Sequence, residues 1–304
     1  MSSNQKFKNK IVIITGANGF IGRNLVSSLS KSRTSNWTIR ALVKNIAHEP
    51  VLKSIGAHSV YECHLPDKID LNCFNTDKDS EISAVIHCAH STNSKRSNYD
   101  NVTGTHKLYE LTKRHSEAQF ILMSSLAAHE GATSQYGKCK LLLEDKMNLS
   151  QDVIIKPGTV VGHGGLFLRI KNLMSRMPIV PVFFSKAHGL QFIAIDDLCA
   201  AVENILITKK IGQFIVAHPD PTKPIEFYRI LQKYLKTKNY IIKAPGELAL
   251  LATVSAERLG INLPISSDNL RGLRDARTFN STDDLKRLGI EPQSLEEALK
   301  KSSF

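Results

Sequence analysis

The hydrophobic positions in the first half of the chain alternate between two patterns. Short continuous apolar runs, typical of strands buried on both faces, occur at residues 11–14, 38–43, 59–62, 84–87, 120–123 and 153–155. Segments in which apolar residues recur every three or four positions, as on one face of a helix, lie at about 22–31, 98–114 and 134–148. With a further run at about 213–216, this alternation predicts an α/β fold, namely a Rossmann-type doubly wound parallel sheet with helices on both faces.

The second half of the chain loses this regular alternation at about residue 158. Glycine- and proline-rich stretches at 162–165 and 178–181 are predicted to be loops, and helices are predicted at about 224–237, 245–259 and 266–273. We interpret this half as a small, mostly helical lobe that binds the substrate. The predicted domains are a dinucleotide-binding core over residues 1–160 and a substrate lobe over residues 161–304, with about 190–220 returning to the core sheet.

The segment Thr15–Gly22 lies between the first apolar run and the first helical pattern, and it reads Thr-Gly-Ala-Asn-Gly-Phe-Ile-Gly. This succession of strand, glycine-rich turn and helix is typical of a site that binds a dinucleotide pyrophosphate. Backbone amides and the positive end of the helix dipole face the anion there. A tight turn without a ligand is the alternative interpretation. The expected contacts to the dinucleotide come from Gly16, Asn18, Gly19, Phe20, Ile21 and Gly22.

A second set of candidate residues follows the apolar run 120–123. Ser125 comes two residues after this strand, at the edge where doubly wound sheets bind their ligands. Tyr136 and Lys140 are four positions apart, so on a helix they share one face. An adjacent ammonium group and a nicotinamide cation stabilise a phenolate, which makes Tyr136 an acid/base candidate for hydride transfer. Ser125 would hydrogen-bond the reacting oxygen, and Lys140 would also hold the nicotinamide ribose. A Tyr/Lys pair that merely faces solvent is the alternative.

Together these segments resemble the extended short-chain dehydrogenase/reductases, the NAD(P)-dependent epimerase/dehydratase group, over nearly the whole chain. Thr15–Gly22 is similar to their TGxxGFIG turn, and Ser125, Tyr136 and Lys140 fall on their catalytic Ser, Tyr and Lys. Other similar segments are Val85–His90 (VIHxAA), Asn101–Thr105 (NVxGT), Lys156–Gly158 (RPG), Ile195–Leu198 (VxDL) and Leu288–Pro292 with Leu295–Glu297 (LGxxP and LEE). The resemblance implies that Cys88, Ala89 and Pro157 contact the dinucleotide, and it offers a two-helix homodimer as a precedent.

The chain also departs from the family's pattern. Cys63-His64-Leu65 stands where the family has Gly-Asp-Leu, so His64 is the candidate to replace the aspartate that meets the adenine. The interval from Ser125 to Tyr136 is shorter than in most sugar-nucleotide epimerases and dehydratases. It is similar to that of atypical members, including the nucleotide-binding accessory subunit of respiratory complex I, some of which bind the cofactor without catalysis. Leu126-Ala127 replaces the dehydratases' Asp/Glu pair, so dehydration is not expected.

The end of the second strand indicates which dinucleotide is bound. It reads Val43-Lys44-Asn45, and no acidic residue follows Gly22 until Glu49. An NAD-selecting carboxylate would stand here to bind the ribose hydroxyls, whereas a lysine suits a 2′-phosphate. We therefore predict NADP, with Lys44 as a contact and NAD as the alternative. An exposed lysine without a ligand role is the other interpretation of Lys44.

Composition narrows the classes of partner. The chain has 304 residues and a net charge of +12, which favours an anionic small-molecule substrate, although the basic residues are spread out and predict no nucleic-acid site. Five scattered cysteines without CxxC spacing, and a first strand close to Met1, predict reduced thiols and a cytoplasmic protein without a membrane span. The histidine and cysteine spacings predict no metal site.

The substrate is the least determined part of the prediction. The first hypothesis is an NAD(P)-dependent oxidoreductase or epimerase that acts on a secondary alcohol or keto group, above all of a nucleotide-linked sugar. Basic residues that could clamp its diphosphate, or else form solvated surfaces, are Arg169, Lys171, Arg176, Lys186, Arg271, Arg274 and Arg277. The amphipathic segment Leu248–Leu259 could instead cover an apolar, sterol-like alcohol, or simply pack in the core. The other class of function is a non-catalytic NAD(P)-binding sensor or assembly subunit.

Overall fold

The computed structural model describes residues 8–91, 97–184, 189–261, 263 and 265–301. The chain divides into two compact units. The first comprises Met1–Met123, Leu143–Ile155 and Cys199–Phe214, and the second comprises Ser124–Leu142, Lys156–Leu198 and Ile215–Phe304. Lys186, one of the predicted phosphate-clamping residues, lies outside the described residues.

The first unit is built on an eight-stranded sheet with the order β11-β7-β6-β5-β1-β2-β3-β4. Its pairs β1–β2, β1–β5, β2–β3, β5–β6 and β6–β7 are parallel, and the short β4 pairs with β3 in the antiparallel direction. The strands are β1 Asn9–Thr15, β2 Trp37–Val43, β3 Ser59–His64, β4 Lys68–Ile69, β5 Ser80–His87, β6 Gln119–Met123, β7 Val153–Pro157 and β11 Gly212–Val216. This order confirms the predicted Rossmann-type sheet.

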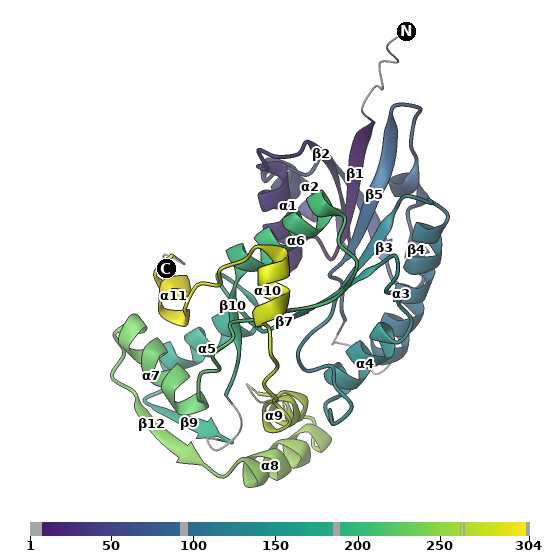
Figure 1. Ribbon diagram of the computed structural model, residues 1–304. Coiled ribbons are helices and arrows are strands. Elements are labelled where there is room, and N and C mark those ends of the chain that lie inside the picture. Colours follow the sequence, from purple (N-terminus) through teal and green to yellow (C-terminus); the bar gives the residue numbers. More distant parts are fainter. Residues whose placement is uncertain (1–7, 92–96, 185–188, 262, 264, 302–304) are drawn as a thin grey trace. The chain divides into compact units, whose positions relative to one another are not determined.

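Helices flank this sheet on both sides, as Figure 1 shows for α1 and α6 against α3. The helical segments are α1 Phe20–Ser30, η1 Ile46–His48, α2 Glu49–Ser54, η2 Leu71–Phe74, α3 Ser97–Lys113 and α6 Ile195–Thr208. Successive residues of a strand point to opposite faces, and the two faces of β1 are both buried, so the strand reads as a continuous apolar run. Ile11 and Ile13 pack in one cluster with Leu108 of α3 and Phe120 of β6.

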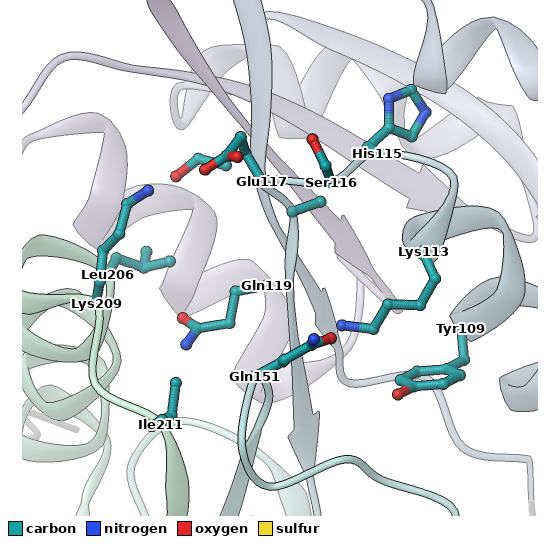
Figure 2. A pocket seen from close by; sticks show the side chains of 12 residues that line it. Tyr109, Lys113, His115, Ser116, Glu117, Gln119, Gln151, Leu206, Lys209 and Ile211 are labelled. Carbon is teal, nitrogen blue, oxygen red and sulfur yellow. The ribbon is translucent and has the colours of Figure 1, made fainter.

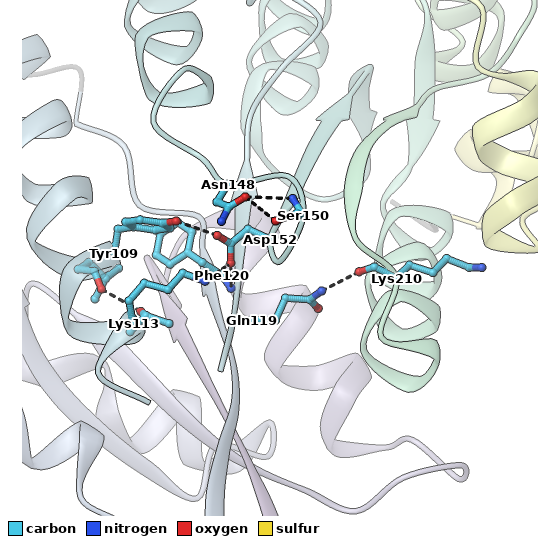
Figure 3. A network of polar contacts seen from close by, with 10 residues as sticks. Tyr109, Lys113, Gln119, Phe120, Asn148, Ser150, Asp152 and Lys210 are labelled. Carbon is cyan, nitrogen blue, oxygen red and sulfur yellow. Dashed lines mark hydrogen bonds and ion pairs between the residues drawn. The ribbon is translucent and has the colours of Figure 1, made fainter. Parts of the chain in front are cut away.

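The amino end of this sheet is held by one buried carboxylate. Asp152 is fully buried, and its Oδ2 accepts a hydrogen bond from Tyr109 Oη at 2.9 Å. Its Oδ1 accepts from the backbone N–H of Phe120 at 2.9 Å and from Lys113 Nζ at 2.5 Å. Figure 3 shows these contacts, with Gln119 Nε2 donating to the carbonyl of Lys210 at 2.6 Å. The network joins α3, β6 and the residues before β7 and β11, so it is a structural clamp on the sheet.

The second unit contains two small parallel sheets, β8–β10 and β9–β12, and most of the C-terminal helices. Its strands are β8 Thr159–Val161, β9 Ile179–Phe183, β10 Phe192–Ala194 and β12 Tyr240–Ala244. Its helices are α4 Gln135–Glu144, α5 Gly165–Arg176, α7 Pro224–Leu235, α8 Gly246–Arg258, α9 Ser267–Arg274, α10 Thr282–Leu288 and α11 Leu295–Lys301. The prediction of a loop over 178–181 was wrong: Pro181 lies in β9, within a two-stranded sheet whose open edges tolerate the missing amide.

An aromatic and aliphatic core fills the second unit. Phe192 of β10 stacks on Phe227 of α7 at a centroid distance of 4.8 Å, and both rings are buried. Asp197 at the start of α6 ties the C-terminal segment to this core, because its carboxylate accepts hydrogen bonds from the amide of Gln293 at 2.8 Å and from Gln293 Nε2 at 2.7 Å. Two of the family-like segments, at 195–198 and 288–297, therefore hold each other in place.

None of the described helices is both long and apolar enough to cross a membrane.

Candidate functional site

The glycine turn after β1 has the backbone that its sequence predicts. Gly16 adopts φ +64°, a left-handed conformation that favours glycine, and a Cβ there would lie 2.8 Å from the backbone of Ala89. A Cβ on Gly22 would lie 2.4 Å from the carbonyl oxygen of Gly16. Glycine at position 16 therefore lets the turn approach the segment after β5, and glycine at position 22 lets α1 approach the turn. Gly19 is the N-cap of α1, and no side chain caps this helix. The first backbone amides of α1 can therefore bind an anion.

A buried chain of hydrogen bonds lies behind this turn. The Oγ1 of Thr15 contacts Nδ1 of His87 at 2.7 Å, and the Oγ1 of Thr105 contacts Nε2 of the same ring at 2.9 Å. Thr105 also donates to the carbonyl of Asn101 at 2.7 Å, and the amide of Ala89 donates to Thr15 Oγ1 at 3.3 Å. The ends of β1 and β5 are thereby fixed to α3. The sequence motifs marked these segments, but the positioning role of His87 was not predicted.

The other candidates of the first unit lie just after β2, β3 and β5 or at their ends. Gly16 contacts the backbone of Cys88 and Ala89, which follow β5. Lys44 is exposed just after β2, and its charge acts on the thiol of Cys63, whose pKa burial raises to about 11. His64, the next residue, has its Nε2 3.0 Å from Glu62 Oε1. Lys44 and the end of β3 are therefore neighbours, as expected if both serve the adenosine half of a dinucleotide.

The second unit brings together the three predicted catalytic residues. Ser125 follows β6, and Tyr136 and Lys140 are carried one turn apart by α4. The side chains of Ser125 and Tyr136 are hydrogen-bonded to each other, and Lys140 Nζ lies 6.0 Å from the centre of the Tyr136 ring. Lys140 is only 2% exposed, so the alternative of a solvent-facing Tyr/Lys pair does not describe this chain.

The turn that holds Ser125 is itself well supported. Its Oγ accepts from the amide of Ala127 at 3.1 Å, and the carbonyl of Pro157 accepts from the amide of Leu126 at 3.2 Å. The buried ammonium group of Lys156 donates to the carbonyl of Ala128 at 2.6 Å. Pro157, predicted from the family resemblance as a cofactor contact, thus lies beside the residue that follows Ser125.

A residue that sequence reasoning missed caps the helix of Tyr136. The carboxylate of Asp268, on α9, accepts hydrogen bonds from the amides of Gln135 at 2.6 Å and Tyr136 at 3.2 Å. A carboxylate at a helix N-terminus satisfies orphan amides and complements the helix dipole. Asp268 lies 132 residues beyond Tyr136 in sequence, so no local spacing signals this contact. At the same helix, a Cβ on Gly137 would lie 2.4 Å from the carbonyl of Ala127.

The electrostatics of Tyr136 combine opposing effects. Burial raises the pKa of its hydroxyl above the ordinary value, whereas the hydrogen bond with Ser125 lowers it. The group is therefore a protonated phenol at neutral pH in the protein alone. A protonated, half-buried phenol beside a serine hydroxyl can donate a proton to an oxygen atom placed between them.

The predicted phosphate clamp of α9 is engaged within the protein. Arg274 Nε lies 3.0 Å from Asp275 Oδ1, and its Nη2 donates to Thr133 Oγ1 at 2.7 Å. Arg271 Nη1 donates to Ser267 Oγ at 3.0 Å. On α5, burial lowers the pKa of Lys171. The α9 arginines therefore position α9 against the segment before Tyr136, and a diphosphate would have to compete for them.

A cavity of about 620 Å³ lies elsewhere, at the amino end of the sheet in the first unit. Figure 2 shows its mixed lining, which includes Lys113, His115, Glu117, Gln119 and Lys209. None of the predicted site residues lines it. Within the described part of the chain, no group of three or more His, Cys, Asp or Glu side chains is placed to hold a metal ion.

Known proteins resemble the chain in the same regions. Residues 12–150 match the NAD dependent epimerase/dehydratase family. A ceramide reductase of Caulobacter vibrioides is 27% identical over 285 residues, which cover 90% of this chain and 85% of that protein. The predicted resemblance to the epimerase/dehydratase family is therefore confirmed, over residues 12–150.

Solved structures extend the likeness to the whole fold. A nucleoside-diphosphate-sugar epimerase from Staphylococcus aureus superposes with a TM-score of 0.73 at 13% identity, covering 95% of this chain and 99% of that one. A UDP-glucose 4-epimerase from Bifidobacterium longum, in complex with NAD+ and UDP, gives 0.68 at 15% identity, with 96% and 97% covered. At these identities the likeness concerns the fold. The family match supports an NAD(P)-dependent oxidoreductase or epimerase.

Proposed function

Starting from the match of residues 12–150 to an NAD dependent epimerase/dehydratase family, we propose that the chain is an NAD(P)H-dependent reductase of a keto group, with Tyr136 as its acid/base residue. The observation that carries the proposal is the hydrogen bond between Ser125 and Tyr136 above the buried Lys140. A structural tyrosine needs neither partner. All three side chains come from the positions that the family uses for hydride-transfer chemistry.

The roles of the chain's own groups follow from their chemistry. A bound nicotinamide dinucleotide supplies the hydride, and the amides of the glycine turn, with Lys44, would hold its phosphates. As the carbonyl carbon receives the hydride, Tyr136 donates its proton to the carbonyl oxygen and the product is a secondary alcohol. Ser125 hydrogen-bonds the same oxygen, and the Lys140 ammonium stabilises the phenolate that remains.

Reduction is the direction that we propose. Burial raises the pKa of Tyr136, so the free protein presents the protonated phenol that donates a proton in a reduction. The relative named ceramide reductase supports reductases ahead of epimerases, in which Tyr136 must act in both directions.

For the substrate we propose a long, apolar molecule that carries the keto group. The support is the relative named ceramide reductase, whose likeness spans 90% of this chain. A nucleotide-linked sugar is the second candidate. It is favoured by the charge of +12 and by Arg169 and Lys171 on α5, whereas the α9 arginines are already engaged.

NADP is the cofactor in this proposal, because Lys44 is exposed after β2 where an NAD-binding carboxylate would otherwise stand. A cytoplasmic location, the absence of a nucleic-acid partner and a homodimer complete it. No disulfide bond joins the cysteines of the described chain, which agrees with a reducing compartment. A non-catalytic dinucleotide-binding subunit is the competing function.

Substitution Tyr136→Phe tests the assignment. With NADPH and a panel of long-chain ketones, hydroxysteroids and UDP-, GDP- and dTDP-sugars, we expect kcat to fall by about 100-fold or more. Because epimerases give no net absorbance change, product analysis accompanies the absorbance of the reduced nicotinamide. The affinity for NADPH should change little, because the pyrophosphate is held by the glycine turn.

Tyr109→Phe is the matched control, since the Tyr109 hydroxyl contacts Asp152 and should leave turnover intact. Full turnover by the Tyr136→Phe variant would show that the catalytic assignment is wrong. Tight NADPH binding without turnover of any compound by the unmodified protein would favour the non-catalytic subunit.

A further inference from the structure

Helix α8 of the second unit carries leucines on two opposite faces. Leu250 and Thr253 are buried on the face that packs against α9. Leu248, Leu251 and Leu259 lie on the other face, where they are 64%, 65% and 77% exposed. A surface helix ordinarily presents polar side chains outward, so this second apolar face is not explained by core packing. Core packing, one of the two roles predicted for the segment 248–259, does not describe these three leucines.

The apolar surface extends beyond the helix at both ends. At its C-terminal end, the amide of Ile261 donates to the carbonyl of Ala256 at 2.9 Å, which keeps the exposed Ile261 beside the helix end. At its N-terminal end, β12 runs through Pro245 directly into α8, as Figure 1 shows. A Cβ on Gly246 would meet the ring of Phe184, so the residue after β9 also touches the helix start.

The exposed face of the β9–β12 sheet is apolar as well. Ile179 and Tyr240 are register partners in this parallel pair, so their side chains share one face, and both are exposed. Ile242, two residues further along β12, points the same way and is also exposed. We call the exposed side chains of Ile179, Tyr240, Ile242, Leu248, Leu251, Leu259 and Ile261 the α8 apolar surface.

Basic residues accompany this surface, and the nearby acids are engaged. Lys238 precedes β12 and Arg258 ends α8, and both are exposed; Lys243, also exposed, lies on the face of β12 opposite to Tyr240 and Ile242. Of the acids on α8, Glu257 accepts hydrogen bonds from the amide and hydroxyl of Ser267 at 2.7 and 2.6 Å. Glu247 forms an ion pair with Arg274 at 3.7 Å. The charge left around the apolar side chains is therefore positive.

We propose that the α8 apolar surface docks on the face of an anionic lipid bilayer. Exposed leucines and isoleucines would enter the acyl boundary, Tyr240 would lie at the headgroup level, and Lys238 and Arg258 would meet anionic headgroups. The charge complementarity selects this occupant over a second copy of the chain, because two such surfaces would bring like charges together. Docking does not depend on the proposed reductase activity, although it would give such an enzyme access to an apolar substrate.

Co-sedimentation of the full-length protein with lipid vesicles tests the proposal. We expect binding to vesicles of equal parts phosphatidylglycerol and phosphatidylcholine, and little binding to pure phosphatidylcholine. Salt at ~1 M, where the Debye length is about 3 Å, should weaken the binding. The double variant Leu248→Ser/Leu251→Ser should lower partitioning by about 100-fold, at about tenfold per leucine.

Two further variants separate the contributions. Lys238→Gln/Arg258→Gln should lower partitioning into anionic vesicles by about 25-fold, at about fivefold for each charge. Leu71→Ser is the matched control, because Leu71 is an equally exposed leucine of the first unit and should leave binding unchanged. Thermal unfolding and NADPH titration of each variant show that the fold is retained, independently of any turnover.

Three outcomes would overturn the proposal: no binding of the unmodified protein to anionic vesicles, binding that the Leu248→Ser/Leu251→Ser variant retains, or equal binding to neutral vesicles. Light scattering addresses the alternative occupant. A lipid-free dimer that the same double variant converts to a monomer would show that this surface is an interface between two copies.

Discussion

The two ends of the sheet in the first unit are both rich in polar groups, but these groups have different partners. At the amino end, Asp152 is surrounded by the donors of Tyr109, Lys113 and Phe120, so the polar atoms satisfy one another. At the carboxyl end, Gly16 and Gly22 leave backbone amides with no side chain over them. The large cavity lies at the amino end. The cavity and the uncapped start of α1 therefore lie at different ends of the sheet, and the uncapped start of α1 is where we propose that an anion binds.

The largest effect should come from filling the carboxyl end. In Gly22→Ala the new Cβ would lie 2.4 Å from the carbonyl oxygen of Gly16, so α1 must move away from the turn. We expect NADPH affinity to fall by about 100-fold or more, and stability to fall by about 1–3 kcal/mol. Fluorescence titration and thermal unfolding measure the two effects.

Gly272→Ala is the control for this change, because a Cβ there makes only ordinary contacts at 3.9 Å with Ser134. Its NADPH affinity should match that of the unmodified protein. Undiminished NADPH binding by Gly22→Ala would contradict the proposal that the glycine turn, at the carboxyl end of the sheet, binds the dinucleotide.

The next effect concerns the amino end and should appear in stability alone. Asp152→Ala leaves Tyr109 and the Phe120 amide without an acceptor, which should cost about 3 kcal/mol of unfolding free energy. The affinity for NADPH should stay within about twofold, since no dinucleotide contact is removed. Denaturant unfolding and fluorescence titration check both statements.

Gln151→Ala, at the neighbouring residue, which lines the cavity, is the control and should change neither quantity by much. A strong loss of NADPH affinity in Asp152→Ala, with the fold intact, would contradict a purely structural role for the amino end of the sheet.

A smaller effect is expected from Lys44, which follows β2 at the carboxyl end of the sheet, on the preference for NADPH over NADH. Lys44→Ala removes a point charge beside the proposed 2′-phosphate, so NADPH affinity should fall by about tenfold and NADH affinity should hardly change. Parallel titrations with both dinucleotides measure the ratio. Arg33→Ala, another cation of the first unit, should leave the ratio unchanged. Tighter binding of NADH than of NADPH by the unmodified protein would show that NADP is the wrong cofactor.

The smallest effect is a pH dependence at the amino end. Burial lowers the pKa of His115, which stacks on Phe74 at 5.6 Å. The folded protein therefore takes up a proton at this ring less readily than the unfolded chain. The stability from this residue is fully present above pH ~6.5 and is lost as the pH falls through the folded-state pKa. The free energy of unfolding, measured with denaturant between pH 7 and 5, should depend less steeply on pH in His115→Phe than in the unmodified protein. A difference of one pKa unit between the folded and unfolded states corresponds to ~1.4 kcal/mol. An unchanged slope would contradict the assignment.

The sheet of the first unit was predictable because its strands are buried on both faces. Each one therefore reads as a short apolar run bounded by turn residues, as Ile11–Ile14 does. The same logic located the catalytic candidates, since Ser125 follows a strand and Tyr136 and Lys140 are related by the period of a helix. These signals are local, and the structure preserves them.

What escaped prediction depends on contacts between distant segments. Strand β9 was hidden because Pro181 is tolerated only where a sheet edge is open, and that edge is a tertiary property. Asp268 and the His87 chain act through hydrogen bonds across 132 and 72 residues, which leave no spacing to detect. The outward leucines of α8 belong to a helix that was predicted correctly, but periodicity alone does not say which of two apolar faces is covered.

The cap that Asp268 places on α4 has a consequence for dissecting the protein. Residues 12–150, the part that matches the family, include Ser125, Tyr136 and Lys140, yet the amides of Gln135 and Tyr136 find their acceptor on α9. A fragment that ends near residue 150 would keep every catalytic candidate and lose the group that anchors their helix. The chemistry at Tyr136 is thus expected to depend on a residue outside the segment that matches the family.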